Sequence, residues 1–157
     1  MQQTAQDRPG NIPWPPIIYA AALAAAWLLE RWLPLPALDE NLLMRWLGAA
    51  IFLCGLGVGL MGLMALRAAG TTFDPTGPAD ALATQGLYAR SRNPLYLAAL
   101  IAFLGLGLAL RSTWLLVAVP AVCVALLKLA IEPEEAYLER RFGESYRRYR
   151  TRVRRWI

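Results

Sequence analysis

Long runs of apolar residues, separated by short polar segments, make up most of this chain. The runs cover residues 14–33, 46–66, 95–110 and 114–131. The second run holds no charged side chain, and about 20 apolar residues are enough for a helix to cross a bilayer. The pattern therefore predicts an all-α integral membrane bundle of about four transmembrane helices, which forms a single membrane domain over residues 1–157.

The first run is predicted to be a retained helix and not a cleaved signal peptide. A signal peptide has a positively charged region ahead of its apolar core and a small-residue cleavage site behind it. Here the charges of Asp7 and Arg8 cancel each other. Glu30 and Arg31 end the run, where charged residues are typical of a helix end at the membrane interface.

The second run contains Gly55 and Gly59 in a GxxxG spacing. This spacing is typical of helices that approach each other closely, although glycine is frequent in membrane helices in general. The pair is compatible with a homodimer and does not require one.

The composition limits the kinds of protein and of site that the chain can form. Hydrophobic residues make up 57% of the chain and charged residues 17%, whereas a soluble domain is about half apolar and a quarter charged. Histidine is absent, which removes the commonest general base and metal ligand. Cys54 and Cys123 lie in apolar runs without a CxxC partner, so we expect packing residues and no metal site.

Basic residues predict the orientation of the bundle. With four spans, twelve arginines fall on the side of the N-terminus, the loop 67–94 and the tail, and three fall on the other side. Loops rich in Lys and Arg stay in the cytoplasm. We therefore expect a protein of the bacterial inner membrane with both termini cytoplasmic.

The tail, residues 134–157, is predicted to be an amphipathic cytoplasmic helix. Its apolar residues recur every three or four positions, as one face of a helix requires. Eight arginines flank this stripe between Arg140 and Arg155. Such a helix lies on a membrane surface with its arginines on lipid phosphates, so the expected partners are membrane lipids and not nucleic acid. The stripe consists of Leu138, Phe142, Tyr146, Tyr149, Val153 and Trp156.

Two polar motifs are expected to meet at the cytoplasmic face. The loop 67–94 is long and punctuated by glycine and proline, which is more often functional than filler. It ends in Asn93-Pro94, which would also serve as an ordinary helix cap. Glu134 and Glu135 follow the fourth run, where acids would also suit a first helical turn, although carboxylates at a membrane boundary usually have partners. Because runs three and four form a hairpin, both motifs return to the same side and predict a pocket for a polar cofactor beside a lipid-soluble substrate.

These motifs resemble a known family. Residues 86–96 (GLYARSRNPLY) resemble the R-H/N-P-x-Y element of isoprenylcysteine carboxyl methyltransferases and related phospholipid methyltransferases. Residues 134–155 are similar to their E-E-x-x-L…F-G-x-x-Y-x-x-Y…V-x-R tail. The similarity extends from about Gly70 to the C-terminus, and the ordered set of motifs is more specific than any one of them.

The resemblance implies a methyltransferase that uses S-adenosyl-L-methionine and a lipid-soluble or small apolar methyl acceptor. The cofactor would be bound by Tyr88, Ala89, Arg90, Ser91, Asn93, Pro94, Tyr96 and Glu134. The substrate would be met by Arg141, Tyr146, Tyr149 and Arg154. The catalytic candidates are Asn93, Tyr96 and Glu135, of which Asn93 cannot take a proton at neutral pH. The family's eukaryotic carboxyl methyltransferases carry histidine in place of Asn93, so their prenylcysteine substrate is not carried over.

Two other classes remain open from the residues alone. A small four-helix transporter or channel would need an ionisable residue buried in mid-span, and runs two and three have none. A membrane reductase with a nicotinamide cofactor lacks a GxGxxG motif here, but such reductases need not have one.

Overall fold

The computed structural model describes residues 14–36, 38, 41–71 and 79–157, so residues 72–78 of the predicted loop and the first 13 residues lie outside the described part. Within these ranges the chain is all-helical, without strands, which confirms the predicted fold class. The elements are α1 (Trp14–Trp32), α2 (Leu42–Ala68), the 3-10 turn η2 (Gly86–Ala89), α3 (Pro94–Leu110), α4 (Thr113–Leu126), the π-helical segment η3 (Leu127–Ile131), α5 (Glu132–Phe142) and α6 (Glu144–Arg152).

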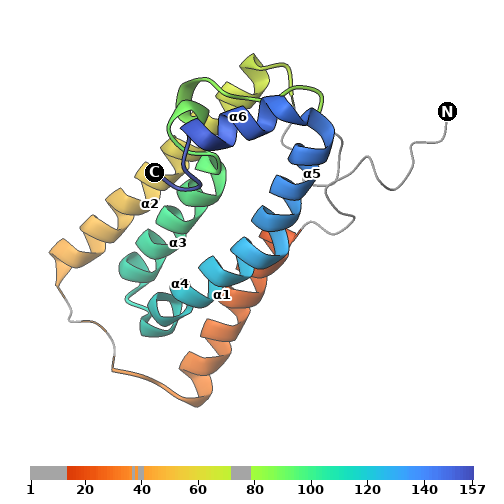
Figure 1. Cartoon of the computed structure of the whole chain (residues 1–157). Helices are drawn as coiled ribbons and strands as arrows, with labels where there is room; N and C mark the ends of the chain where they lie inside the picture. Colours follow the sequence, from red (N-terminus) through yellow and green to blue (C-terminus); the bar gives the residue numbers. More distant parts are fainter. Residues whose placement is uncertain (1–13, 37, 39–40, 72–78) are drawn as a thin grey trace.

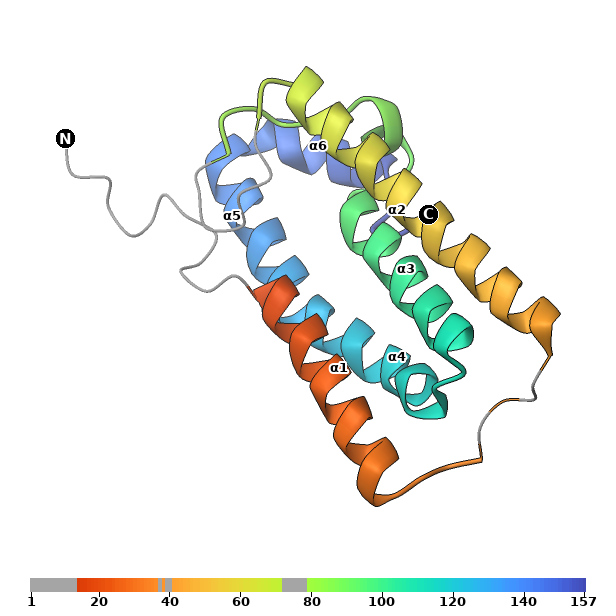
Figure 2. The ribbon, with the colours of Figure 1, turned by 180° about the vertical axis from the view of Figure 1, so that it is seen from behind.

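The four long helices form an antiparallel bundle (Figures 1 and 2). α1 lies along α4, α2 lies along α3, and a tight turn joins α3 to α4. One end of the bundle carries residues 79–93, α5 and α6, and we call it the polar end. Because α2 and α4 both run toward this end, the loop before α3 and the start of α5 come together there.

Glycines allow α2 and α3 to pack with their backbones in contact. A Cβ at Gly48 would overlap the backbone at Ala109, and one at Gly105 would overlap the backbone nitrogen of Phe52. Gly55 is equally close to Ala102, so one member of the GxxxG pair is used inside the chain. Small residues allow such close approach between membrane helices.

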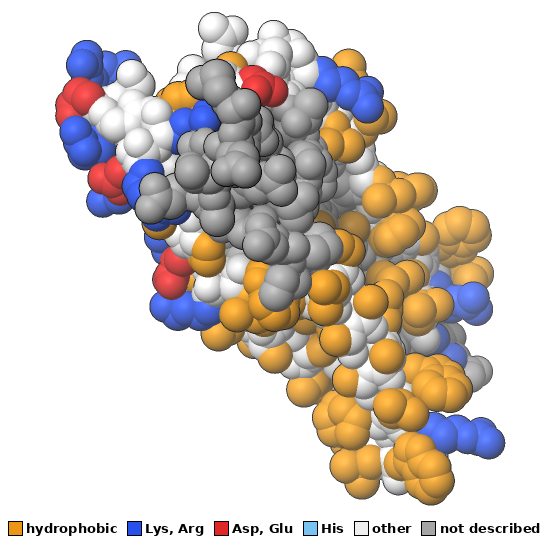
Figure 3. Space-filling view, turned by 90° about the vertical axis from the view of Figure 1, so that its right-hand side faces the viewer, with side chains coloured by type: hydrophobic (Ala, Val, Ile, Leu, Met, Phe, Trp, Pro, Cys, Tyr) orange, Lys and Arg blue, Asp and Glu red, His pale blue; other side chains and the backbone are white. Residues whose placement is uncertain are grey.

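The outer surface of the bundle is apolar. Large side chains on α2 such as Leu53, Leu60 and Met64 are exposed, which a soluble protein would avoid over so large an area. Two described helices, α2 and the continuous helix Thr113–Phe142, are long and apolar enough to cross a membrane, and α3 is a shorter apolar helix. Figure 3 shows hydrophobic side chains over the lower part of one face. The acidic side chains in view lie toward the upper end, whereas basic side chains lie both there and along the lower right edge.

α4, η3 and α5 form one helix, where the sequence predicted a span followed by a separate tail. Pro133 has no N–H, and its ring crowds the carbonyl four residues earlier. The π-helical segment immediately before it widens the turn, with the Glu132 N–H donating to the Leu127 carbonyl. The apolar stretch ends at Ile131, so α5 continues beyond it as a polar extension.

The predicted tail helix is divided in two at Gly143. This residue has φ 53° and ψ −122°, a conformation that suits glycine and few other residues. The break turns α6 back across the polar end (Figure 1). As a result Tyr146 and Tyr149, which the stripe predicted to face the membrane surface, are buried against the bundle.

Candidate functional site

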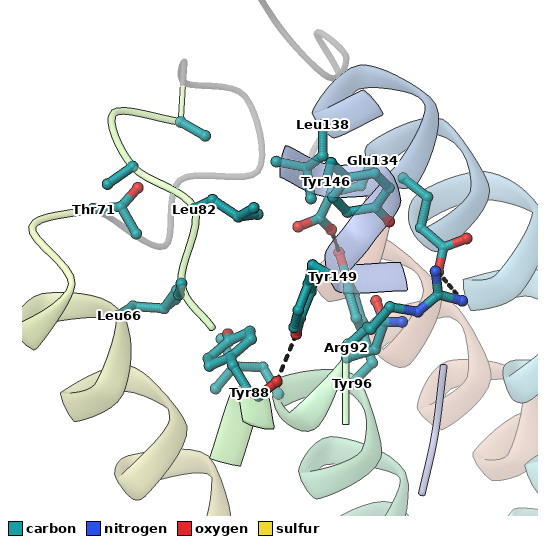
Figure 4. A pocket seen from close by; sticks show the side chains of 16 residues that line it. Leu66, Thr71, Leu82, Tyr88, Arg92, Tyr96, Glu134, Leu138, Tyr146 and Tyr149 are labelled. Atoms are coloured by element: carbon teal, nitrogen blue, oxygen red, sulfur yellow. Dashed lines mark hydrogen bonds and ion pairs between the residues drawn. The ribbon is translucent and has the colours of Figure 1, made fainter. Parts of the chain in front are cut away.

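A pocket opens at the polar end, among the end of α2, residues 79–83, η2, the start of α3, α5 and α6. Its cavity volume is about 90 Å³, smaller than the range of about 300–1,000 Å³ for small-molecule sites. In Figure 4 the aliphatic Leu66 and Leu82 lie on one side, and Tyr96, Arg92 and Glu134 lie on the other. The lining consists of Leu66, Thr71, Ala79, Ala81, Leu82, Ala83, Tyr88, Arg92, Asn93, Leu95, Tyr96, Glu134, Glu135, Leu138, Tyr146 and Tyr149.

The pocket brings together the two motifs that the sequence placed at one membrane face. Tyr96, in the first turn of α3, donates a 2.7 Å hydrogen bond to the Glu134 carboxylate at the start of α5. Burial raises the pKa of Glu134, and the hydrogen bond from Tyr96 opposes this effect only in part. A carboxylate held in a partly apolar pocket favours a cationic or hydrogen-donating ligand, because such a ligand stabilises its charged form.

Three further tyrosines surround this pair. Tyr149 donates a 2.7 Å hydrogen bond to the backbone oxygen of Tyr88, which ties α6 to η2. The rings of Tyr146 and Tyr149 are tilted, with their centroids 6.2 Å apart. Burial raises the pKa of Tyr146 to about 12 and raises the pKa values of Tyr88 and Tyr149 as well. All three are therefore neutral phenols at physiological pH, suited to packing and hydrogen bonding.

Glu135, one residue further along α5, is held between two arginines. Arg155 binds it through two nitrogens at 3.1 and 2.7 Å, and Arg92 approaches to 3.3 Å. The side chains of Arg92 and Glu135 are only 10% and 11% exposed. Glu135 is a predicted catalytic residue, and these ion pairs favour a positioning role over a free base, because both its oxygens are engaged.

The last five residues, Val153–Ile157, form what we call the C-terminal strap. The Arg154 carbonyl accepts a 3.0 Å bond from the Arg92 N–H, and the Arg155 carbonyl accepts bonds from the Asn93 amide nitrogen at 3.2 Å and the Ser91 hydroxyl at 3.3 Å. Trp156 packs against the hydrophobic core. Asn93 stands at the N-cap position of α3, but its side chain makes no capping bond, so its amide serves the strap and not the helix.

The structure separates the predicted site residues into two groups. Those that line the pocket are Tyr88, Asn93, Tyr96, Glu134, Glu135, Tyr146 and Tyr149. Those outside its lining are Ala89, Arg90, Ser91, Pro94, Arg141 and Arg154. Arg141 lies outside the pocket and donates a 2.5 Å hydrogen bond to the Ala79 carbonyl. The Tyr137 hydroxyl accepts a 2.9 Å hydrogen bond from the Ala79 N–H.

Some lining residues were not predicted from the sequence. Arg92 lies inside the motif of residues 86–96, directly between Ser91 and Asn93, and this position was the available signal. Leu66 near the end of α2, Thr71 just beyond that helix and Leu82 in the loop carried no local signal, because only the tertiary fold brings them to the pocket.

The apolar outer surface and the two long apolar helices indicate a membrane protein, and the pocket at the polar end is its candidate site. Comparison with known families identifies the class: the phospholipid methyltransferase family model matches residues 43–145, more than half of the chain, and the chain belongs to that family. The family makes it a membrane methyltransferase. The matched region runs from α2 into α6 and includes both Asn93 and Glu134.

One curated relative is an uncharacterized protein of Haemophilus influenzae. It is 36% identical over 63 residues, which make up 40% of this chain and the whole of the relative. No solved structure matches the chain.

Proposed function

We propose that this protein is an S-adenosyl-L-methionine-dependent methyltransferase that acts at the cytoplasmic membrane face on a lipid-soluble or small apolar acceptor. The family supports methyl transfer. The observation that carries the choice of cofactor is the Glu134 carboxylate, hydrogen-bonded to Tyr96 inside the pocket.

The residues of the pocket fit this cofactor. Its positive charge suits the carboxylate of Glu134, and its flat adenine suits a pocket lined by aliphatic side chains and tyrosine rings. Tyrosine faces attract a ligand cation by about 0.5–2 kcal/mol. Bound there, S-adenosyl-L-methionine would supply a methyl group on a positively charged sulfur that is already a good leaving group.

The protein's contribution is then to orient the cofactor and the methyl acceptor and to exclude water. Alignment of two bound reactants can supply many orders of magnitude in rate. Residues 79–83 and α6 form part of the pocket wall, and Ala79 is tied to α5 through Tyr137 and Arg141. A site walled in this way limits the access of water.

Apart from Glu134, which this proposal assigns to the positive charge of the cofactor, the pocket offers little general-base chemistry. Tyr88, Tyr146 and Tyr149 are neutral, Asn93 does not titrate, and Glu135 is paired with arginines. This favours an acceptor that needs no strong base, such as a carboxylate or an amine that arrives neutral. The aliphatic side of the pocket, with Leu66 and Leu82, suits the apolar part of that acceptor.

Isothermal titration calorimetry of the purified protein in detergent or nanodiscs tests the proposal. We expect micromolar binding of S-adenosyl-L-methionine and of its demethylated product, and no competition by a nicotinamide dinucleotide. Glu134→Ala should abolish binding. The matched control is Glu132→Ala, on the same turn of α5, whose carboxylate pairs with Lys128 at an exposed position. The proposal fails if neither ligand binds the wild type, and the site lies elsewhere if Glu134→Ala binds normally.

A further inference from the structure

Exposed arginines gather at one side of the polar end, outside the pocket. Arg67 lies in the last turn of α2, and Arg90 directly follows η2. Arg152 lies in the last turn of α6, and Arg154 lies in the C-terminal strap. All four side chains are exposed, and none of them forms an ion pair within the described residues. We call these four residues the arginine rim.

Contacts between chain segments bring the members of the rim together. The Arg92 N–H donates a 3.0 Å hydrogen bond to the Arg154 carbonyl, so the strap lies beside the segment between η2 and α3. η2 in turn packs against the end of α2, where a Cβ at Gly86 would come within 3.5 Å of the Ala65 Cβ. Figures 1 and 2 both place the C-terminus beside α2 and α3. Residues from four parts of the sequence therefore meet on this side of the bundle.

The rim stands where apolar helices end. The apolar α2 ends one residue beyond Arg67, and the apolar α3 begins four residues beyond Arg90. In the strap, Trp156 packs against the hydrophobic core and Ile157 is 77% exposed, so apolar side chains closely follow Arg154. Tryptophan is typical of the membrane–water interface, and arginine can keep its charged end among the headgroups there. The rim therefore lies at the depth of the lipid phosphates.

Other arginines of α6 differ from the rim because they have acidic partners. Arg147 and Arg148 both pair with Glu144, and Arg150 pairs with Glu139. The rim carries four positive charges that no carboxylate among the described residues pairs with. Like charges held near one another by backbone contacts repel, and bound anions offset this repulsion. The surface thus favours an anionic partner.

We propose that the arginine rim binds the headgroups of anionic phospholipids in the membrane that the bundle crosses. A guanidinium donates directed, charge-assisted hydrogen bonds to phosphate oxygens, and a negative membrane surface attracts basic residues beside it. A phospholipid fits this place better than nucleic acid, because its acyl chains can lie along the exposed apolar side chains of α2 while its phosphate meets the rim. The four arginines lie outside the pocket lining, so lipid binding is independent of the proposed methyl transfer.

Lipid retention tests the rim directly. The protein is reconstituted in bilayers with equal parts of phosphatidylglycerol and phosphatidylcholine and released into a mild neutral detergent, and native mass spectrometry then counts the lipids that stay bound. We expect the wild type to retain phosphatidylglycerol at least about fivefold over phosphatidylcholine. A wash in about 1 M salt before the measurement should reduce this preference. Equal retention of the two lipids would overturn the proposal.

Matched double substitutions locate the effect. Arg90→Gln/Arg152→Gln removes two charges of the rim and should lower the preference for phosphatidylglycerol at least about threefold. The control is Arg147→Gln/Arg148→Gln, which removes two exposed charges of α6 that pair with Glu144 and should keep the preference. An equal loss in both double variants would show that net charge alone attracts the lipid, and it would overturn the rim as a binding surface.

Two further measurements complete the test. Thermal unfolding in neutral detergent checks that the variants fold, and if Arg90→Gln/Arg152→Gln did not, the wild-type comparison of the two lipids and the single Arg152→Gln substitution would still decide. A DNA duplex is the competing ligand. The wild type in nanodiscs of phosphatidylcholine should not bind it, and binding of the duplex without a preference for phosphatidylglycerol would overturn the proposal in favour of nucleic acid.

Discussion

Tyr96 donates a 2.7 Å hydrogen bond to Glu134, which joins the first turn of α3 to the first turn of α5 across 38 residues of sequence. The bond is the direct link between the two motifs that the sequence suggested. It also fixes the orientation of the one pocket carboxylate that has no arginine partner among the described residues.

Loss of this hydrogen bond should loosen the cofactor site with little effect on the fold. In Tyr96→Phe the ring remains packed, and Glu134 loses a donor that favours its charged form, so its pKa should rise further. We expect cofactor affinity to fall roughly five- to tenfold and the free energy of unfolding to change by about 1 kcal/mol. Calorimetry and thermal unfolding measure the two effects separately. Unchanged affinity would show that Tyr96 does not position Glu134.

Cofactor binding should strengthen as pH rises through the pKa of Glu134. Burial places this pKa above its ordinary value, so at lower pH the carboxyl is protonated and cannot attract a positive charge. A titration of affinity against pH should show this increase in the wild type and a flat profile over the same range in Glu134→Gln. A wild-type profile as flat as that of the variant would exclude Glu134 as the group that meets the charge.

The same pKa has the opposite consequence for the stability of the unliganded protein. A carboxyl whose pKa is raised on folding stabilises the fold below its unfolded pKa, and this contribution is lost as pH rises through the folded pKa. Glu134→Gln should therefore be more stable than the wild type at neutral pH, and the difference should shrink toward acid pH. Thermal unfolding across the pH range checks this, with Glu132→Gln as a control that should follow the wild type.

The C-terminal strap should stabilise the pocket wall through the ion pair of Arg155 with Glu135. Arg155→Ala removes the two-nitrogen contact with Glu135 and leaves a largely buried carboxylate with Arg92 alone. We expect a loss of about 1–3 kcal/mol in the free energy of unfolding, since Arg155 is partly exposed, together with weaker cofactor binding. The neighbouring Arg154→Ala is the control, because Arg154 contributes its backbone carbonyl to the strap and its side chain is exposed. Equal effects of the two substitutions would argue against the ion pair.

Close packing of α2 on α3 should not tolerate a side chain at the contact. Gly105→Leu would force the helices apart, because even a Cβ overlaps the backbone of Phe52. Overpacking of this kind costs about 1–3 kcal/mol or more, so we expect lower thermal stability and a broadened size-exclusion profile. Gly57→Leu, on the open face of α2, should behave like the wild type. A stable Gly105→Leu protein would contradict the observed helix contact.

Local pattern determined much of the fold in advance. Each apolar run of sufficient length formed a helix near its predicted position, because helix formation and burial in an apolar medium depend on residues close together in sequence. The pairing of the Asn93 and Glu134 motifs also followed from the sequence, since an even number of passes returns the chain to the same side. The resemblance of the motifs to the family, and not local pattern, pointed to Tyr88, Tyr96 and Glu134.

Tertiary structure decided what those helices touch. The spacing of Tyr146 and Tyr149 identified a helix face, but periodicity does not say what covers a face, and the turn at Gly143 directed it into the pocket and not onto the membrane surface. The close contact between α2 and α3 at Gly48, Gly55 and Gly105 likewise joins residues far apart in the chain. So do the ion pairs of Glu135 with Arg92 and Arg155. Such contacts depend on the relative placement of whole helices, and no single stretch of sequence encodes that placement.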